Sequence, residues 1–197
     1  MEYERRRKLF SLFLLLIVIG LITVVVSIAY NAGWLKNPTA TLQQNQPGLY
    51  TISHYVDGDT IDVNMNGSLE TVRFIGVDTP ETHKPNTPVQ CYGPQAAAYT
   101  KQLISKFGRV RLQADPLDTN RDRYGRLLRY VYLPDGTLVE AQTISQGYGF
   151  AYTQFPFQKA DEFKADGQAA KAAKKGLWGA CQVTTESNGR EQTNPAN

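Results

Sequence analysis

Three patterns of hydrophobic and polar residues follow one another along this chain of 197 residues. An uninterrupted apolar run extends from Leu9 to Tyr30, apolar and polar residues alternate over much of 50–77, and apolar residues recur at helical spacing after Pro94. An unbroken run of this length is typical of a membrane-spanning helix, whereas alternation predicts strands with one buried face. The pattern therefore predicts one membrane segment followed by a folded domain.

The apolar run directly follows four basic residues, Arg5 to Lys8. Positive residues remain on the cytoplasmic side of a membrane. The sequence thus predicts a cytoplasmic segment (1–8) and a single-pass transmembrane signal anchor (9–30), with the remainder outside the cytoplasm. A signal peptide cleaved after Ser27-Ile28-Ala29 is one alternative and would give a secreted protein, although the run exceeds the ~7–15 residues of a typical signal core. A helix buried in a soluble domain is the other alternative.

Two polar segments flank the expected domain. Residues 31–48 contain two prolines and no apolar period, which predicts a linker. Residues 182–197 are mostly Gln, Thr, Ser, Asn and Gly with a few charges, which predicts a disordered tail. The intervening residues, 49–181, are numerous enough to form one hydrophobic core.

Alternation and turn residues predict the order of elements in this domain. In 60–65, Ile61, Val63 and Met65 share one face, and the Asn66-Gly67 pair that follows is a strong hairpin signal. The full prediction is strands at 50–55, 60–65 and 71–77, a helix at 95–107, strands at 110–113 and 127–133, and helices at 138–146 and 158–175. This order predicts a mainly β fold with helices (α+β), namely a five-stranded OB-like Greek-key barrel with three helices, preceded by one transmembrane helix.

Composition excludes a chain that is disordered throughout, and the charge distribution excludes nucleic-acid binding through bulk charge. A hydrophobic share of 42% and a charged share of 20% are ordinary for globular proteins, so the chain as a whole is not disordered. The net charge of +3 comes entirely from residues 1–36, which carry five basic and two acidic residues, while the remainder carries 16 of each. The folded part therefore has no bulk charge that predicts nucleic-acid binding, and any such binding must come from local placement of charges.

Three short segments carry the candidate chemistry: 56–60 (VDGDT), 73–82 (RFIGVDTPET) and 122–126 (DRYGR). Each alone is compatible with a turn, a strand exit or surface charge. Together, with Tyr92-Gly93-Pro94 before the first helix and Gly176-Leu177-Trp178 after the last, they resemble the staphylococcal nuclease (thermonuclease) family. The resemblance covers essentially all of residues 50–180 and implies an OB barrel with three helices.

The resemblance also implies roles for individual residues. A calcium ion (Ca²⁺) would be held by two carboxylates and one backbone carbonyl, from Asp59, Asp78 and Thr79. The catalytic residues would be two arginines that grip the phosphate and a glutamate that orients or deprotonates the attacking water, namely Arg73, Arg126 and Glu81. The substrate would further contact Arg123, which stands where the best-known member has a lysine, and two aromatic residues, Tyr124 and Tyr152.

This residue set suits phosphodiester hydrolysis on physical grounds. Calcium is a hard cation that prefers oxygen ligands, and a planar guanidinium can bind phosphate oxygens with two parallel hydrogen bonds. The expected function is a calcium-dependent, sequence-tolerant endonuclease acting on single-stranded DNA and RNA, together with duplex DNA, since bases can stack on tyrosines without being read. A non-catalytic nucleic-acid-binding OB module is the alternative. Beyond the lipid bilayer that holds residues 9–30, no obligate protein partner is inferred.

Cys91 and Cys181 are the two cysteines of the chain. They could be unrelated small residues, or they could form a disulfide that pins the long loop to the last helix. A location outside the cytoplasm permits the bond, and no third cysteine competes for it. The best-known member of the family lacks this pair.

Overall fold

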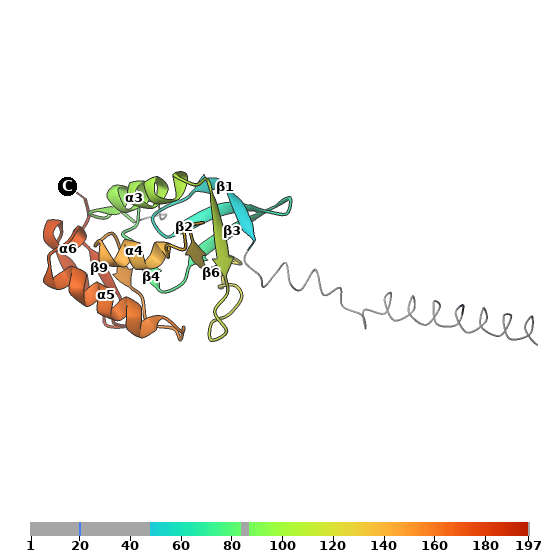
Figure 1. Cartoon of the computed structure of the whole chain (residues 1–197). Coiled ribbons are helices and arrows are strands. Elements are labelled where there is room, and N and C mark those ends of the chain that lie inside the picture. Colours follow the sequence, from blue (N-terminus) through green and yellow to red (C-terminus); the bar gives the residue numbers. More distant parts are fainter. Residues whose placement is uncertain (1–19, 21–47, 84–86, 197) are drawn as a thin grey trace, which may run out of the picture. The chain divides into compact units, whose positions relative to one another are not determined.

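The computed structural model describes residues 20, 48–83 and 87–196 (Figure 1). The chain divides into two compact units, Met1–Gln44 and Asn45–Asn197, and the second contains nearly all of the described residues. The predicted membrane anchor at 9–30 and the linker at 31–48 lie almost wholly outside them. Within the described residues, no helix is both long enough and apolar enough to cross a membrane.

The centre of the domain is a closed five-stranded β-barrel, as the sequence predicts, and its strands run in mixed directions (Figure 1). Its strands are β1 (Leu49–Tyr55), β2 (Thr60–Met65), β3 (Ser68–Phe74), β5 (Arg109–Gln113) and β6 (Leu127–Tyr132). They close in the order β1-β2-β3-β6-β5, in which β3 and β6 run parallel and all other neighbours run antiparallel. Closure leaves no free sheet edge in this barrel.

The β2–β3 hairpin shows why the local sequence folds this way. Ile61 and Val63 are completely buried, in agreement with the predicted face. Asn66 and Gly67 have φ angles of 56° and 93°, which is the left-handed conformation that a two-residue hairpin turn requires. The turn sets the register of the two strands and thereby places Thr60 opposite Arg73.

Within residues 87–196, three helices pack around the barrel and a fourth, short helix follows them. They are α3 (Gly93–Ser105), α4 (Val139–Ser145), α5 (Ala160–Ala172) and α6 (Leu177–Ala180). Each of the first three directs a fully buried side chain into the common core, namely Ile104, Ile144 and Phe163. The helix predicted at 158–175 ends earlier, because Lys174 adopts a positive φ of 52° that is incompatible with a continuing helix.

The strand predicted at 71–77 is interrupted. Gly76 has a φ of 73°, and a Cβ atom at this position would lie 2.5 Å from the Phe157 ring. The chain therefore turns after β3 and forms a separate two-residue strand, β4 (Val77–Asp78), which pairs with β7 (Phe150–Ala151). This break brings Asp78 back beside Arg73.

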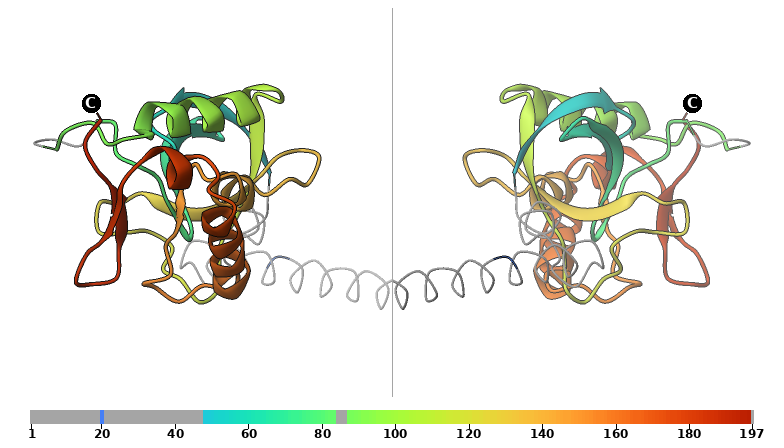
Figure 2. Two further views of the ribbon diagram at one scale, coloured as in Figure 1. Left: turned by 90° about the vertical axis from the view of Figure 1, so that its left-hand side faces the viewer. Right: turned by 90° about the vertical axis from the view of Figure 1, so that its right-hand side faces the viewer.

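The tail predicted to be disordered is instead an ordered hairpin. Strand β8 (Val183–Thr185) pairs with β9 (Glu191–Thr193), and Figure 2 shows the hairpin in dark red at the side of the domain. The prediction was wrong because the residues that follow β9 gain hydrogen bonds from a distant loop, which holds the hairpin in place. The Cys91 amide donates to the Asn194 carbonyl over 2.7 Å, and the Ala196 amide donates to the Val89 carbonyl over 2.8 Å.

Candidate active site

Arg73 is the centre of a cluster of charged side chains at the end of β3. One guanidinium nitrogen, Nη1, lies 2.8 Å from Oδ2 of Asp59, and the other, Nη2, lies 2.9 Å from Oδ1 of Asp78. Nη1 also donates a hydrogen bond to the Val77 carbonyl. Burial alone would lower the pKa of Arg73, but the negative charges of Asp59 and Asp78 outweigh it and raise the pKa. The guanidinium therefore remains charged.

Asp59 is fixed by a close approach of two backbone segments. Its Oδ2 accepts hydrogen bonds from the Thr79 amide at 2.8 Å and from the Thr79 hydroxyl at 3.0 Å. A Cβ atom on Gly58 would lie only 2.7 Å from that hydroxyl, so the approach requires a glycine. The buried Thr100 hydroxyl on α3 donates to the Gly58 carbonyl over 2.7 Å and anchors the turn.

Asp57 belongs to the same cluster, although sequence reasoning treated it as part of a turn. Its Oδ1 accepts a hydrogen bond from the Asp59 amide at 3.1 Å. Burial, together with the nearby charge of Asp59, raises the pKa of Asp57 to about 8. At neutral pH this carboxyl group therefore holds a proton for much of the time, which limits the negative charge around Arg73.

Glu81 lies on the long loop that follows Asp78, and the loop is fixed at two points. The Glu81 amide donates to Oε1 of Gln90 over 2.8 Å, and the Gln90 amide donates to the Glu81 carbonyl over 2.9 Å. Gly93, at the start of α3, approaches so closely that a Cβ atom there would lie 2.9 Å from the Glu81 carbonyl oxygen. Gln90 and Gly93 thus hold Glu81 near the cluster, and the sequence motifs did not predict this role.

Arg190 is a site residue that sequence reasoning missed. It lies on the C-terminal hairpin, yet its Nε is 2.8 Å from Oδ2 of Asp78 and its Nη2 is 3.6 Å from Oε1 of Glu81. No signal pointed to it, because it belongs to a polar segment without periodicity and lies 112 positions from Asp78. The structure therefore places Arg190 beside Arg73 on Asp78, although the sequence predicted Arg73 and Arg126 at the site.

The other predicted phosphate-binding arginine, Arg126, has a different partner. Its Nε lies 2.7 Å from Oδ2 of Asp122, and its guanidinium lies over the Tyr124 ring, 5.4 Å from the centroid. Arg123 contacts the same ring at 4.8 Å. These contacts hold Arg123, Tyr124 and Arg126 together, and none of the described contacts joins them to Arg73. Convergence of Arg73 and Arg126 on one phosphate stays a prediction.

Tyr152, the second predicted aromatic contact, lies close to the C-terminal hairpin. Its hydroxyl donates to Oε1 of Gln154 over 3.1 Å, and the Gln154 side-chain amide donates to the Asn188 carbonyl over 2.8 Å. Its backbone amide donates to the Gly76 carbonyl, which places it beside the chain break that precedes Asp78. Tyr152 is therefore near the acidic cluster, while Tyr124 is held within its own loop.

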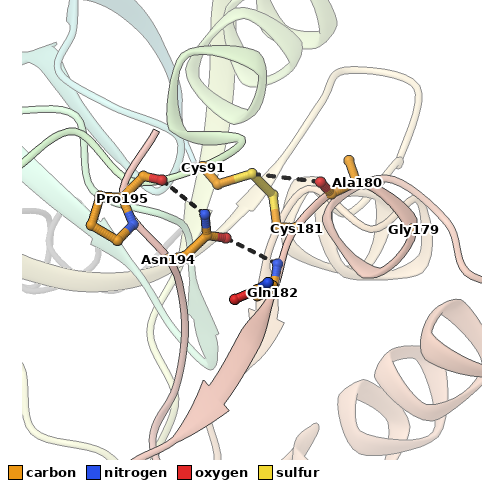
Figure 3. Close-up of a pocket in the computed structure, with 7 residues that line it drawn as sticks. All are labelled: Cys91, Gly179, Ala180, Cys181, Gln182, Asn194 and Pro195. Atoms are coloured by element: carbon orange, nitrogen blue, oxygen red, sulfur yellow. Dashed lines mark hydrogen bonds between the residues drawn. A yellow bond between two sulfur atoms is a disulfide. The ribbon is translucent and has the colours of Figure 1, made fainter. Parts of the chain in front are cut away.

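Cys91 and Cys181 form a disulfide with an S–S distance of 1.99 Å, as the second of the two sequence readings expects. The bond lines a surface pocket together with Ala180, Gln182 and Asn194 (Figure 3). Asn194 connects the pocket to the hairpin, because its Oδ1 accepts a hydrogen bond from the Gln182 amide at 2.9 Å. The disulfide thus fastens the base of the hairpin to the loop that carries Glu81.

Comparison with the sequences of known proteins covers most of the residues that form this site. Residues 71–180, more than half of the chain, match the model of the family described as staphylococcal nuclease homologue. The chain belongs to the staphylococcal nuclease family. The matched region contains Arg73, Asp78, Thr79, Glu81 and the 122–126 segment, while Asp59 lies just before it.

Relatives within the staphylococcal nuclease family include endonucleases and thermonucleases. The chain is 45% identical over 130 residues to the SPbeta prophage-derived endonuclease YokF of Bacillus subtilis (strain 168), which covers 65% of this chain and 43% of the relative. It is equally similar to endonuclease YncB of the same strain, over 60% of that relative. The thermonuclease of Staphylococcus hyicus is 36% identical over 84% of this chain and 95% of its own length. The chain thus spans less than two thirds of both Bacillus relatives.

The donor chemistry of the cluster fits the calcium ion that resemblance to the staphylococcal nuclease family implies. The side chains of Asp59 and Asp78 are almost fully buried and offer only oxygen ligands, which a hard cation prefers. Counting Glu81, three carboxylates face the two guanidiniums of Arg73 and Arg190, so negative charge is in excess. Within the described residues, no three His, Cys, Asp or Glu side chains are arranged to hold a metal ion. Backbone, water or substrate oxygens would have to complete the coordination.

Proposed function

We propose that this member of the staphylococcal nuclease family is a calcium-dependent endonuclease that hydrolyses phosphodiester bonds of DNA and RNA. The observation that carries the proposal is the bridge that Arg73 forms between Asp59 and Asp78. It places a phosphate-binding group directly beside two carboxylates suited to a cation. Glu81, the candidate for activating water, is held on the adjoining loop.

Each residue has a distinct task in the proposed reaction. Asp59, Asp78 and the Thr79 carbonyl would hold Ca²⁺, which neutralises phosphate charge when bound. Arg73 would bind the equatorial phosphate oxygens, where negative charge grows as the bond to water forms, and Arg126 would reach the same phosphate from its loop. Glu81 would orient the attacking water or take its proton, provided that the water comes within about 2.6–3.2 Å of the carboxylate.

Sequence-tolerant recognition of flexible strands is supported by the exposed aromatic surface near the predicted substrate. Tyr124 is 68% exposed and is held by the guanidiniums of Arg123 and Arg126, so its ring and these charges are available together. A base can stack on such a ring whatever its identity. We therefore propose single-stranded DNA and RNA as the preferred substrates, with duplex DNA also accepted.

We further propose that the nuclease domain is anchored in the cell membrane by residues 9–30 and lies outside the cytoplasm. The apolar run and the basic residues before it support this placement. The Cys91–Cys181 disulfide supports it independently, since such bonds persist mainly in oxidising compartments. Secretion after cleavage of the apolar segment is compatible with the same observations.

Cleavage of single-stranded DNA by the full chain tests the proposed activity. We expect cleavage with Ca²⁺ and none with a chelator, and we expect Glu81→Gln to slow cleavage by about 10²–10⁴-fold. The matched control is Glu162→Gln, which alters an exposed glutamate that pairs with Lys159 on α5 and should leave the rate unchanged. Equal cleavage with calcium and with chelator would contradict the proposal. Calcium-independent binding without cleavage would favour a nucleic-acid-binding module.

A further inference from the structure

The C-terminal hairpin (183–193) places the positively charged side chain of Arg190 against residues of the proposed calcium site. Its turn is closed by hydrogen bonds from the Glu186 amide to the Arg190 carbonyl at 2.8 Å and from the Gly189 amide to the Glu186 carbonyl at 2.9 Å. The Arg190 amide also donates to Oδ1 of Asn188 at 2.8 Å. The Arg190 side chain therefore projects from a compact turn toward Asp78.

The contacts of Arg190 are those that a bound cation would make. Its Nε and Nη2 donate to Oδ2 and Oδ1 of Asp78 at 2.8 and 3.2 Å, which engages both oxygens of a carboxylate whose side chain is only 8% exposed. Oδ1 of Asp78 also accepts from Arg73. The same Nη2 extends to Glu81. A two-pronged contact of this kind between an arginine and a carboxylate is among the stronger hydrogen-bonded ion pairs.

A calcium ion and Arg190 would compete for Asp78. Both are positive, and both need the lone pairs of the same carboxylate oxygens. If the binding-competent state is the one in which Arg190 has left Asp78, the apparent calcium affinity falls in proportion to the population of that state. Arg73 also contacts Asp78, but it differs from Arg190 because it lies on a barrel strand and contacts Asp59 as well.

The base of the hairpin and the region near its turn are held by contacts of different kinds. At the base, the Thr193 hydroxyl donates to the Cys91 carbonyl over 2.8 Å, next to the disulfide. Near the turn, the remaining contacts are between exposed groups, namely Gln154 with Asn188 and Lys171 with Glu191. Exposed ion pairs of this kind contribute little to stability and are easily broken. Release of Arg190 therefore does not require unfolding of the hairpin.

We propose that Arg190 is a built-in competitor of calcium: it occupies Asp78 and Glu81 in the ion-free protein and leaves them when the ion binds. The inference rests on the proposed calcium dependence of the nuclease. It gives the C-terminal hairpin a function, since the hairpin sets the calcium concentration at which the site becomes loaded. The Arg190 side chain is positively charged and long enough to contact both carboxylates, and the base of the hairpin is held beside the disulfide.

Calcium binding measured by calorimetry on the full chain, without nucleic acid, tests this inference. We expect Arg190→Gln to lower the dissociation constant for calcium by about tenfold, the scale of one charge-assisted hydrogen bond. Arg190→Lys keeps the charge but loses the fork, and should give an intermediate value. Lys171→Gln is the matched control, because it removes a cation that contacts the same hairpin through Glu191 and not Asp78.

The outcomes separate the two proposals. Unchanged or weaker calcium binding in Arg190→Gln would overturn the competitor role while leaving the calcium dependence intact. An equal gain in Lys171→Gln would also overturn it, since the effect would then come from net charge. Failure of all forms, including the unaltered chain, to bind calcium would refute the calcium dependence and this inference with it.

Discussion

Arg73 joins carboxylates from two separate segments, and this bridge depends on the shape of its side chain. The guanidinium contacts Asp59 with one nitrogen and Asp78 with the other, while only 14% of the side chain is exposed. A lysine ammonium carries the same charge at a single point and cannot span both contacts in the same plane. The residue therefore supplies geometry as well as charge.

Replacement of Arg73 by lysine should abolish most of the nuclease activity. We expect Arg73→Lys to reduce the turnover number by about 10³-fold or more at saturating calcium and substrate, because the charge is kept but the fork is lost. Arg111→Lys is the control, since Arg111 lies over the Tyr132 ring on the barrel and not in the cluster. Turnover of Arg73→Lys within tenfold of the unaltered protein would contradict the assigned role.

Glu140 is another buried ionisable residue, and it lies in α4. It is fully buried, and its carboxyl oxygens accept a hydrogen bond from the Val131 amide at 2.9 and 3.2 Å. Burial raises the pKa of Glu140 well above its ordinary value, and the Val131 hydrogen bond only partly opposes this effect. The folded protein therefore holds a proton that the unfolded chain has already lost.

This proton makes stability depend on pH. The free energy of unfolding should fall as the pH rises above about 4.3, the ordinary value for glutamate, by up to about 1.4 kcal/mol for each pH unit over which only the folded state keeps the proton. Glu140→Gln carries no ionisable group and should show a flatter profile between pH 5 and pH 8. Urea unfolding of both proteins at several pH values measures the difference, and parallel profiles would refute the assignment.

The site residues that could be predicted from sequence lie in the short motifs, Asp59 in 56–60 and the others in 73–82. Arg73, Asp78 and Glu81 lie within nine positions of one another, so their grouping was visible before any fold was known. Arg190 was not predictable, because it lies 112 positions from Asp78 in the sequence and reaches it only in the folded chain. Asp57 was assigned to a turn because Asp-Gly is a common turn pair, and its burial depends on tertiary packing.

At the scale of elements, the site depends on places where regular structure stops. The break at Gly76 ends β3 and turns the chain so that Asp78 returns to Arg73. Alternation of apolar residues predicted β2 and β3, and β-rich runs bounded by turn residues predicted the other barrel strands. The two-residue strands β4 and β7 and the four-residue helix α6 were missed, since elements this short have no period and are held by their partners.

A side chain at Gly58 should disrupt the site by pushing two elements apart. In Gly58→Ala the new methyl group would lie 2.7–2.9 Å from three atoms of the Thr79 side chain, which holds Asp59 in place. We expect a loss of about 1–3 kcal/mol in the free energy of unfolding, the usual range for overpacking, together with a fall in activity. Both can be measured on the purified variant by urea unfolding and DNA cleavage.

Gly167 provides the matched control within a helix. An alanine there would make ordinary contacts, of which the shortest is 3.4 Å to the Ala151 Cβ. Gly167→Ala should stabilise the protein by about 0.5–1 kcal/mol, because glycine is unfavourable inside a helix. If both glycine variants destabilise the protein equally, the close approach at Gly58 is not the cause.

At the scale of the whole molecule, the disulfide connects positions 90 residues apart and joins the loop of Glu81 to the end of the chain. In the loop-entropy model, such a bond stabilises a protein by roughly 4–5 kcal/mol before any strain is subtracted. A double variant, Cys91→Ala with Cys181→Ala, should lose a large part of this amount. It should also show faster amide hydrogen exchange in residues 183–194, because the hairpin loses its anchor.

Urea unfolding and hydrogen exchange of the double variant, next to the unaltered chain with and without reductant, provide the measurement. The reduced chain should match the double variant in both readouts. A double variant as stable as the oxidised parent, with unchanged exchange in the hairpin, would show that backbone hydrogen bonds such as the one from the Cys91 amide to Asn194 suffice.

The position of the hairpin in the sequence means that its contacts with the Glu81 loop form late in synthesis. Synthesis proceeds from the N-terminus, so the barrel strands and the Glu81 loop leave the ribosome before Cys181 and the hairpin exist. The Cys91 thiol must remain unpaired through the synthesis of the next 90 residues. Cys181 and the hairpin that follows it therefore lock the earlier loop and seat Arg190 on Asp78 at a late stage, so a nascent chain arrested before Cys181 would lack both the disulfide and the Arg190–Asp78 contact.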